Sequence, residues 1–282
     1  MFVLYHNDLD GHAAAAVIAH TYQGFHSESK NPITFHSINY KDDVPFEQIK
    51  KNEEVIIVDF SLQKSGEWER LLEITTRVVW IDHHETSINK EGVQNTLRGL
   101  RTTEGSGASL TWKYYQNAVP MPRAIELVED WDTWTHAFGD ETLHFMSGMG
   151  MEDMSPEAPL WTDLLSPAGN DILDDIIKNG SIIKGYKEQS GTKYLDTFGF
   201  ETTLDGYNVL AINRGLISSL MFGDKIEKYD IVSSFVFDGS LFTVSLYSTK
   251  VHVGEIAQKH GGGGHPGAAG FQCKELPYKK EG

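Results

Sequence analysis

Histidine and aspartate residues directly follow three short apolar runs in this chain. His6, Asp8 and Asp10 follow Phe2–Tyr5, Asp59 follows Val55–Val58, and Asp82, His83 and His84 follow Val78–Ile81. A carboxylate and two imidazoles at the end of a buried strand are costly unless they pair or bind a metal. Mixed imidazole and carboxylate donors suit manganese or another first-row divalent ion, and magnesium less well.

Two further segments carry groups of the same kind. Asp130 and Asp132 stand at the end of a predicted helix, where two acids oppose the helix dipole and a metal would offset them. Gly261–Gly264, followed by His265, can present backbone N–H groups to an anion. Each segment also has a plainer interpretation: Asp10 or Asp59 as a helix cap or turn residue, Asp82–His84 as a solvated loop, Asp130 in a surface loop and the glycines as a flexible loop.

The apolar runs predict the elements that would position these groups. Each run is short and β-branched and is apolar on both faces, as in a buried parallel strand. Helical patterns at Gly11–Ala19, Lys64–Thr75, Ser106–Asn117, with Ser106 as N-cap, and Pro122–Glu129 alternate with the runs. This alternation predicts an α/β domain with a parallel sheet, and ligands bind outside the carboxyl ends of such strands. In an extended segment His6, Asp8 and Asp10 would all point the same way.

The second half of the chain has a different pattern. Residues from about 150 to 170 are irregular, and Asp171–Tyr194 is helical in spite of three glycines. Strands are predicted at Tyr207–Asn213, Ile231–Phe237 and Leu241–Tyr247, with a hairpin at Asp238-Gly239 and a helix at Val253–His260. We therefore expect an α/β domain at 1–150 that carries the metal-ligating groups, a linker and connecting helix at 151–197, and a smaller α/β domain at 198–282.

Composition and charge exclude several classes of protein. The 282 residues include no apolar run long enough to span a membrane, and no basic region precedes the first strand, so neither a membrane protein nor a signal peptide is expected. The single Cys273 excludes an intrachain disulfide framework and fits a reducing cytoplasm. The formal net charge of −16 argues against tight binding to long nucleic acid, but not against a small phosphorylated ligand.

Taken together, these segments resemble the DHH phosphoesterase superfamily along nearly the whole chain. His6–Gly11 looks like its first motif, Asp59 the second, Asp82-His83-His84 the third and Asp132 the fourth, and the glycine-rich segment at 261–271 resembles the signature of the DHH-associated C-terminal domain. The HNDLDG opening and the segment around Asp132 look most like the oligoribonuclease (nanoRNase) type B branch.

The resemblance implies a dinuclear centre, normally filled by manganese. By motif, His6 and Asp8 would hold one metal, Asp10, His83 and Asp132 the other, and Asp59 both. Asp82 would orient the site, His84 would contact phosphate, and Gly262, Gly263, Gly264 and His265 would bind a phosphate or terminal nucleotide. Many relatives carry an arginine where this chain has Tyr247, and Arg214 or Lys250 is expected to supply that charge.

The expected function is a manganese-dependent phosphodiesterase that cuts short RNA or DNA to mononucleotides with a water activated by two metals. A 3′-phosphoadenosine 5′-phosphate phosphatase and a cyclic- or linear-dinucleotide phosphodiesterase are the alternatives that share this chemistry. A non-catalytic nucleotide sensor is the alternative of another class, against which the complete set of metal motifs argues. The sequence leaves the oligomeric state open, a homodimer included.

Overall fold

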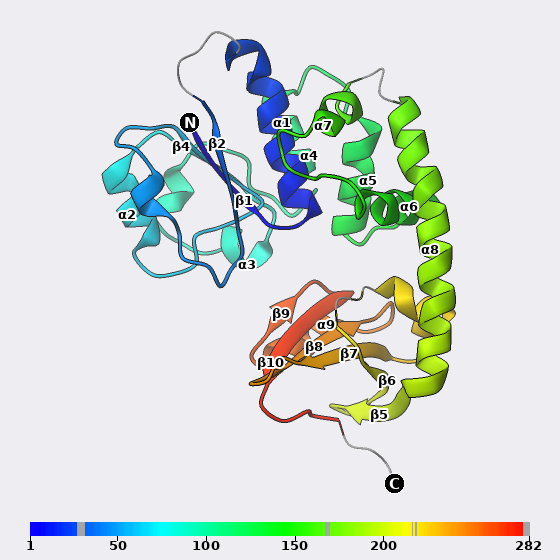
Figure 1. Cartoon of the computed structure of the whole chain (residues 1–282). Helices are drawn as coiled ribbons and strands as arrows, with labels where there is room; N and C mark the ends of the chain where they lie inside the picture. Colours follow the sequence, from blue (N-terminus) through cyan, green and yellow to red (C-terminus); the bar gives the residue numbers. More distant parts are fainter. Residues whose placement is uncertain (27–31, 167–169, 216, 218, 279–282) are drawn as a thin grey trace. The chain divides into compact units, whose positions relative to one another are not determined.

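The computed structural model describes residues 1–26, 32–166, 170–215, 217 and 219–278 (Figure 1). The chain divides into two compact units, Met1–Ser181 and Ile182–Gly282. Among the described residues, no helix is both long enough and apolar enough to cross a lipid bilayer.

The first unit is built on a parallel sheet, as the sequence predicts, and this sheet has four strands, one more than the three that the sequence indicated. The strands are β1 (Phe2–His6), β2 (Thr34–Ile38), β3 (Val55–Val58) and β4 (Val78–Ile81), in the order β2-β1-β3-β4. All three pairings are parallel, so the carboxyl ends of the strands lie along one edge. β3 and β4 are buried throughout because both faces of the sheet are covered.

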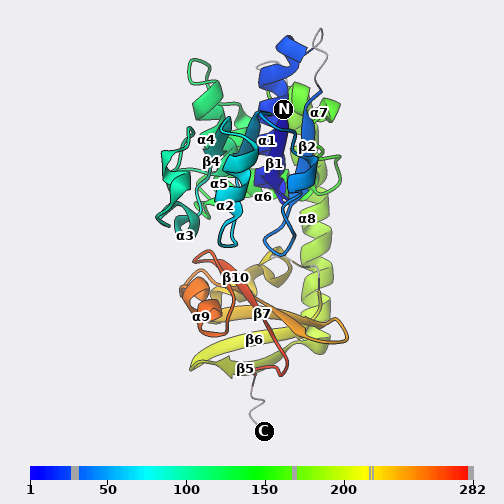
Figure 2. The ribbon, with the colours of Figure 1, turned by 90° about the vertical axis from the view of Figure 1, so that its left-hand side faces the viewer.

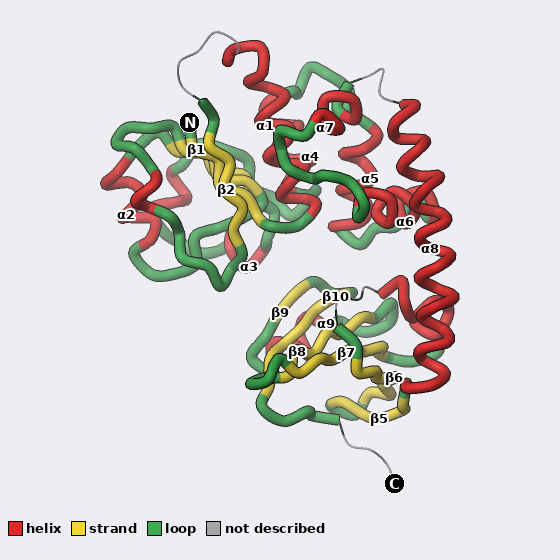
Figure 3. The backbone as a smooth tube through the Cα atoms, viewed as in Figure 1, coloured by secondary structure: helices red, strands yellow, loops and turns green. Residues whose placement is uncertain are grey.

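Helices cover the two faces of this sheet. They are α1 (Leu9–His26), α2 (Glu67–Ile74), α3 (Glu85–Ile88), α4 (Gly107–Tyr115), α5 (Arg123–Asp132), α6 (Asp140–Met149) and α7 (Pro159–Leu164), with 3₁₀ turns η1 (Phe46–Gln48) and η2 (Val93–Thr96). Val3 and Ile56 face a core shared with α1, α4 and α5, whereas Leu4 and Ile57 face α2. Figure 3 shows α2 and α1 on opposite sides of the strands.

A single helix, α8 (Asn170–Phe198), crosses from the first unit into the second. Two of its glycines are required by close packing. A Cβ at Gly180 would lie 1.7 Å from the carbonyl oxygen of His144 in α6, and one at Gly191 would lie 2.4 Å from that of Met221. At Gly185, between them, an added Cβ would meet no atom of the described residues within 4 Å.

The second unit contains a six-stranded sheet in the order β5-β6-β7-β8-β10-β9 (Figure 2). Its elements are β5 (Phe200–Leu204), β6 (Tyr207–Asn213), η3 (Ser219–Glu227), β7 (Ile231–Phe237), β8 (Phe242–Tyr247), α9 (Val253–Lys259), β9 (Gly263–Gly264) and β10 (Ala268–Cys273). The β6–β7 pair is parallel and the other pairs are antiparallel. α9 packs on one face, and Leu195 with Met221 and Phe222 on the other.

The predicted hairpin is present with a longer turn than Asp238-Gly239 alone. The Asp238 carboxylate accepts hydrogen bonds from the amides of Ser240 and Leu241, and β8 therefore begins at Phe242 and not at Leu241. This is a self-contained Asx-type turn of the kind aspartate favours.

Candidate metal centre

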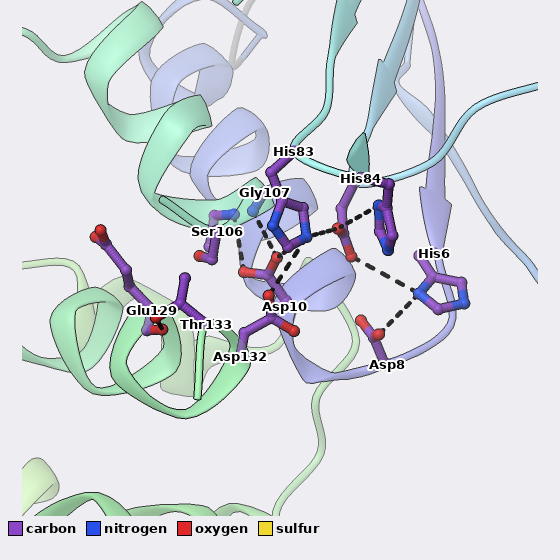
Figure 4. Close-up of polar contacts among 12 residues, drawn as sticks. His6, Asp8, Asp10, His83, His84, Ser106, Gly107, Glu129, Asp132 and Thr133 are labelled. Atoms are coloured by element: carbon purple, nitrogen blue, oxygen red, sulfur yellow. Dashed lines mark hydrogen bonds and ion pairs between the residues drawn. The ribbon is translucent and has the colours of Figure 1, made fainter. Parts of the chain in front are cut away.

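The carboxyl ends of β1, β3 and β4 bring their polar residues to one place (Figure 4). Three groups of donors have ligand atoms that lie within 4.8 Å of one another: His6, Asp8 and Asp59; Asp10, His83 and Asp132; and Asp59, His83 and His84. All six metal ligands expected from the sequence therefore lie together, and they come from five elements (β1, α1, β3, β4 and α5) or from the loops that follow them.

Asp59 lies between two of these groups. Its Oδ2 is 3.8 Å from His6 Nδ1, and its Oδ1 is 3.1 Å from His83 Nε2. On the first side His6 Nδ1 lies 2.7 Å from Asp8 Oδ2, and on the second His83 Nε2 lies 3.3 Å from Asp132 Oδ2. One carboxylate thus faces both donor sets, with one oxygen toward each.

The backbone of the first motif, His6–Gly11, has a different conformation from the extended one that the sequence suggested. The segment is not extended: β1 ends at His6, the chain bends at residues 7 and 8, and α1 begins at Leu9. Asp8, rather than Asp10, caps the helix, because its Oδ1 accepts the amide N–H of Gly11 at 2.9 Å. The turn, and not strand alternation, brings His6, Asp8 and Asp10 to the same side.

Asp10 is held in place by the N-terminus of α4. Its two oxygens accept the amide N–H groups of Gly107 at 2.5 Å and Ala108 at 2.9 Å. Ser106 caps this helix, as predicted, through a reciprocal pair of hydrogen bonds with Ser109. A Cβ at Gly107 would lie 2.4 Å from the Cβ of Asp59, so only glycine lets the helix approach the site this closely. The start of α4 therefore orients Asp10 and packs closely against Asp59.

Asp82 holds the two histidines of the third motif in position through hydrogen bonds. Its Oδ1 accepts the amides of His83 and His84 and lies 2.8 Å from His84 Nδ1. Burial alone would lower the pKa of His84, but the hydrogen bond to Asp82 and the surrounding carboxylates outweigh burial and raise it. Burial lowers the pKa of His83, which favours the neutral imidazole that a metal needs.

The charges of the cluster fit divalent cations. Burial raises the pKa of Asp59 and of Asp132, and the neighbouring carboxylates, chiefly Asp10 and Asp8, raise them further. Both oxygens of Asp59 and Oδ2 of Asp132 are buried, and the described residues offer them no hydrogen-bond donor. Buried carboxylates in this condition require a positive partner or a proton. Metal ions bound by these imidazole and carboxylate groups would satisfy these atoms.

Asp130 does not belong to this cluster. It is buried, and it accepts hydrogen bonds from the amides of Ala137 and Phe138 and from the hydroxyl of Thr142. These donors offset the charge that the sequence suggested a metal would offset. Asp130 therefore anchors the loop between α5 and α6, and Asp132 alone points into the site.

Family comparisons identify the two halves of this architecture. Residues 1–130 match the family model of the DHH family N-terminal domain, and residues 217–281 match that of the DHHA1 domain, which together cover more than two thirds of the chain. The chain belongs to the DHH phosphoesterase superfamily. Members of this superfamily are metal-dependent phosphoesterases.

Relatives of this DHH protein are distant. It is 26% identical over 249 residues to "Uncharacterized protein R106" of Acanthamoeba polyphaga mimivirus, covering 82% of this chain and 56% of the relative, so it spans about half the length of that protein. Similar solved structures include the pGpG-specific phosphodiesterase PggH from Vibrio cholerae, 14% identical with a TM-score of 0.53 over 97% of this chain and 93% of PggH. An exopolyphosphatase-related protein from Bacteroides fragilis is 13% identical with a TM-score of 0.57 over 98% and 87%. Likeness at these identities shows a shared fold.

In the glycine-rich loop of the second unit, some of the backbone amides that were expected to bind an anion already donate hydrogen bonds within the protein. The amide of Gly262 donates to the carbonyl of Ala257 and that of His265 to the carbonyl of Ala268, while Gly263 and Gly264 form β9. The amide of Gly262, expected to face an anion, is therefore already used. Any anion contact from this loop must come from the remaining amides or from the His265 side chain.

The second unit also contains the two residues expected to replace the family arginine. Arg214 lines a pocket of about 510 Å³ together with Tyr247, Tyr186, Lys187 and Ser190, and its guanidinium lies 4.8 Å from the ring centroid of Tyr194. Lys250 is exposed and does not line this pocket. The lining contains two cations and no carboxylate, in a chain whose net charge is −16. Arg214 is therefore better placed than Lys250 to supply the charge beside Tyr247.

Tyr40, which the sequence did not reveal as a site residue, lies at the same sheet edge as the metal centre. It follows β2, whose last residue, Ile38, pairs with His6. Its ring centroid is 5.0 Å from that of His6 and 5.9 Å from that of His84. The sequence signal was weak, because β2 is an edge strand of mixed polarity in which apolar and polar residues do not alternate regularly.

Proposed function

We propose that this protein is a manganese-dependent phosphodiesterase that hydrolyses short oligonucleotides to mononucleotides. The observation that carries the proposal is the position of Asp59, with one oxygen directed at each of two donor sets. A carboxylate shared between two metals is the arrangement that two-metal phosphoryl transfer requires. Its buried oxygens, which no described donor satisfies, support the same assignment.

The residues divide into ligands and orienting groups. We assign His6 and Asp8 to one metal, Asp10, His83 and Asp132 to the other, and Asp59 to both. When bound, the two metals supply an activated water and neutralise the charge that develops on the phosphoryl oxygens. The N-terminus of α4 fixes Asp10, and Asp82 fixes the ring of His84. With Nδ1 held by Asp82, His84 can donate from Nε2 to a phosphate oxygen.

The character of the second unit supports a small nucleotide substrate. Its pocket offers Arg214 and Lys187 for phosphate and exposes Tyr186 for stacking against a base. A long polymer would need an extended basic track, whereas this chain has 24 basic and 40 acidic residues. Arg214 and His265 are thus assigned to substrate binding, and we place the reaction in the cytoplasm.

A linear-dinucleotide phosphodiesterase is the second candidate, favoured by the shared fold of PggH over nearly the whole of both chains. Turnover decides between the candidates. Labelled RNA and DNA dinucleotides, pGpG, 3′-phosphoadenosine 5′-phosphate and pentanucleotides are compared in manganese and in EDTA, with Asp59→Asn as the inactive control. Manganese-dependent release of mononucleotides from both dimers and pentamers supports the proposal. Cleavage confined to pGpG favours the second candidate, and binding without turnover would identify a sensor.

A further inference from the structure

Tyr40 is fixed beside the metal centre although no catalytic motif contains it. The carboxylate of Asp42 accepts the amide N–H of Asn39 at 2.8 Å and shapes the turn that carries Tyr40. The ring stacks on Phe60, with centroids 5.2 Å apart and an interplanar angle of 28°. Phe60 directly follows Asp59, so Tyr40 packs on the loop that presents the shared carboxylate. The position of the ring is therefore determined by packing on both sides.

The hydroxyl of Tyr40 is available for a ligand. It makes no hydrogen bond to any residue that the structure describes, and the side chain remains 39% exposed. A phenol in this position is a neutral hydrogen-bond donor among carboxylates that would otherwise repel a phosphate.

We propose that Tyr40 is a substrate-contacting residue whose hydroxyl donates a hydrogen bond to a non-bridging oxygen of the scissile phosphate. This inference rests on the proposed function in one respect, namely that the substrate is a phosphodiester. Tyr40 and His84 flank the site from the ends of β2 and β4, and together they would orient the phosphate between them. The ring of Tyr40 would also shield His6 from solvent, which is a structural contribution that the test must separate from the contact.

The decisive variant is Tyr40→Phe, which keeps the ring and removes only the hydroxyl. Tyr114→Phe, in α4 outside the cluster, is the matched control. Losing one hydrogen bond to a charged group lowers kcat/KM by roughly ten- to a hundredfold. We expect this loss for a dinucleotide and for bis(4-nitrophenyl) phosphate, with the manganese content and the melting temperature unchanged. The control retains wild-type kcat/KM.

Phosphorothioate substrates test the contact itself. Sulfur accepts hydrogen bonds weakly, so the diastereomer that replaces the contacted oxygen is already slow in the wild type. For that diastereomer the kcat/KM values of the wild type and of Tyr40→Phe should differ by no more than about threefold. For the other diastereomer they should differ as much as for the oxygen substrate. If the ratio of wild-type to Tyr40→Phe kcat/KM is the same for the oxygen substrate and for both diastereomers, the contact is overturned. A loss of manganese from Tyr40→Phe also overturns it, because Tyr40 would then be a positioning residue for His6.

Failure of the proposed function is distinguishable from failure of this inference. If the wild type cleaves bis(4-nitrophenyl) phosphate but no oligonucleotide, the substrate assignment fails and the Tyr40 comparison still stands. If neither is cleaved, calorimetric binding of AMP in manganese provides the readout. A roughly tenfold or greater weakening in Tyr40→Phe supports the contact, and equal affinities overturn it.

Discussion

Asp130 and Asp132 stand two residues apart at the end of α5, and their replacement should have opposite consequences. Asp130 accepts three hydrogen bonds, from Ala137, Phe138 and Thr142. Asp132 is directed at His83, and the described residues offer its Oδ2 no donor. Asparagine is nearly isosteric with aspartate, so both substitutions change charge and acceptor capacity rather than shape. The pair therefore separates a carboxylate that holds the fold from one that serves the metal.

For Asp130→Asn we expect a loss of about 2–3 kcal/mol, because the amide turns one acceptor into a donor that faces backbone N–H groups. In a protein of this size that corresponds to roughly 4–12 °C in melting temperature. Activity per folded molecule and metal content should persist. For Asp132→Asn we expect kcat/KM to fall by more than about a hundredfold and the second metal to bind weakly. Without metal, the same variant should be as stable as the wild type or slightly more stable, since a buried carboxylate with a raised pKa has been removed.

The measurements are thermal melts in EDTA and in manganese, elemental analysis and kcat/KM for both variants. The reasoning is refuted if Asp132→Asn in EDTA is destabilised as much as Asp130→Asn, because Asp132 would then support the fold. It is equally refuted if Asp130→Asn loses a metal.

The geometry of the site and the charge of the chain have four further testable consequences. Asp59→Ala should reduce kcat by roughly a thousandfold or more and lower the metal content below two per chain, because one side chain faces both donor sets. Near wild-type turnover together with an unchanged metal content by elemental analysis would contradict the assignment. In the metal-free protein the raised pKa values of Asp59 and Asp132 mean that the folded state keeps protons that the unfolded chain releases above about pH 4, so stability should fall as the pH rises through those values. Manganese should displace these protons, so calorimetry in buffers of different ionisation enthalpy near pH 6 should detect proton release, and its absence would show that both carboxylates were already ionised. Finally, kcat/KM should be higher for oligonucleotides of two to five residues than for a strand of about 25, and equal rates would indicate a track for long strands that the charge does not suggest.

The ends of the parallel strands were predictable because their sequence signal is local. Val55–Val58 and Val78–Ile81 are apolar throughout, and the residues that follow them could lie only at the carboxyl edge of a buried sheet. The same argument located Asp59 and His83 without any knowledge of the tertiary structure. Ser106 was predictable for the same reason, since a helix cap depends on the residues beside it.

Other features depended on contacts between distant segments. The role of Asp130 was hidden because its donors lie in the following loop and in α6, seven to twelve residues away. The alternation of His6, Asp8 and Asp10 suggested an extended segment, whereas the cap by Asp8 starts a helix inside the motif. Tyr40 was missed because β2 is an edge strand in which only Ile38 is buried, so its pattern is weak.

The glycines of α8 have a consequence for how this protein can diversify. Close packing at Gly180 attaches the helix to the first unit, and close packing at Gly191 attaches it to the second. At Gly185, between them, no atom of the described residues lies within 4 Å of an added Cβ. A genetic crossover at Gly185 would therefore exchange the whole segment that matches the DHHA1 domain, residues 217–281, without breaking either attachment. Chimaeras joined there should inherit an intact metal centre from one parent and an intact second unit from the other. The middle of α8 is thus a junction at which the two halves of the gene can recombine and evolve separately.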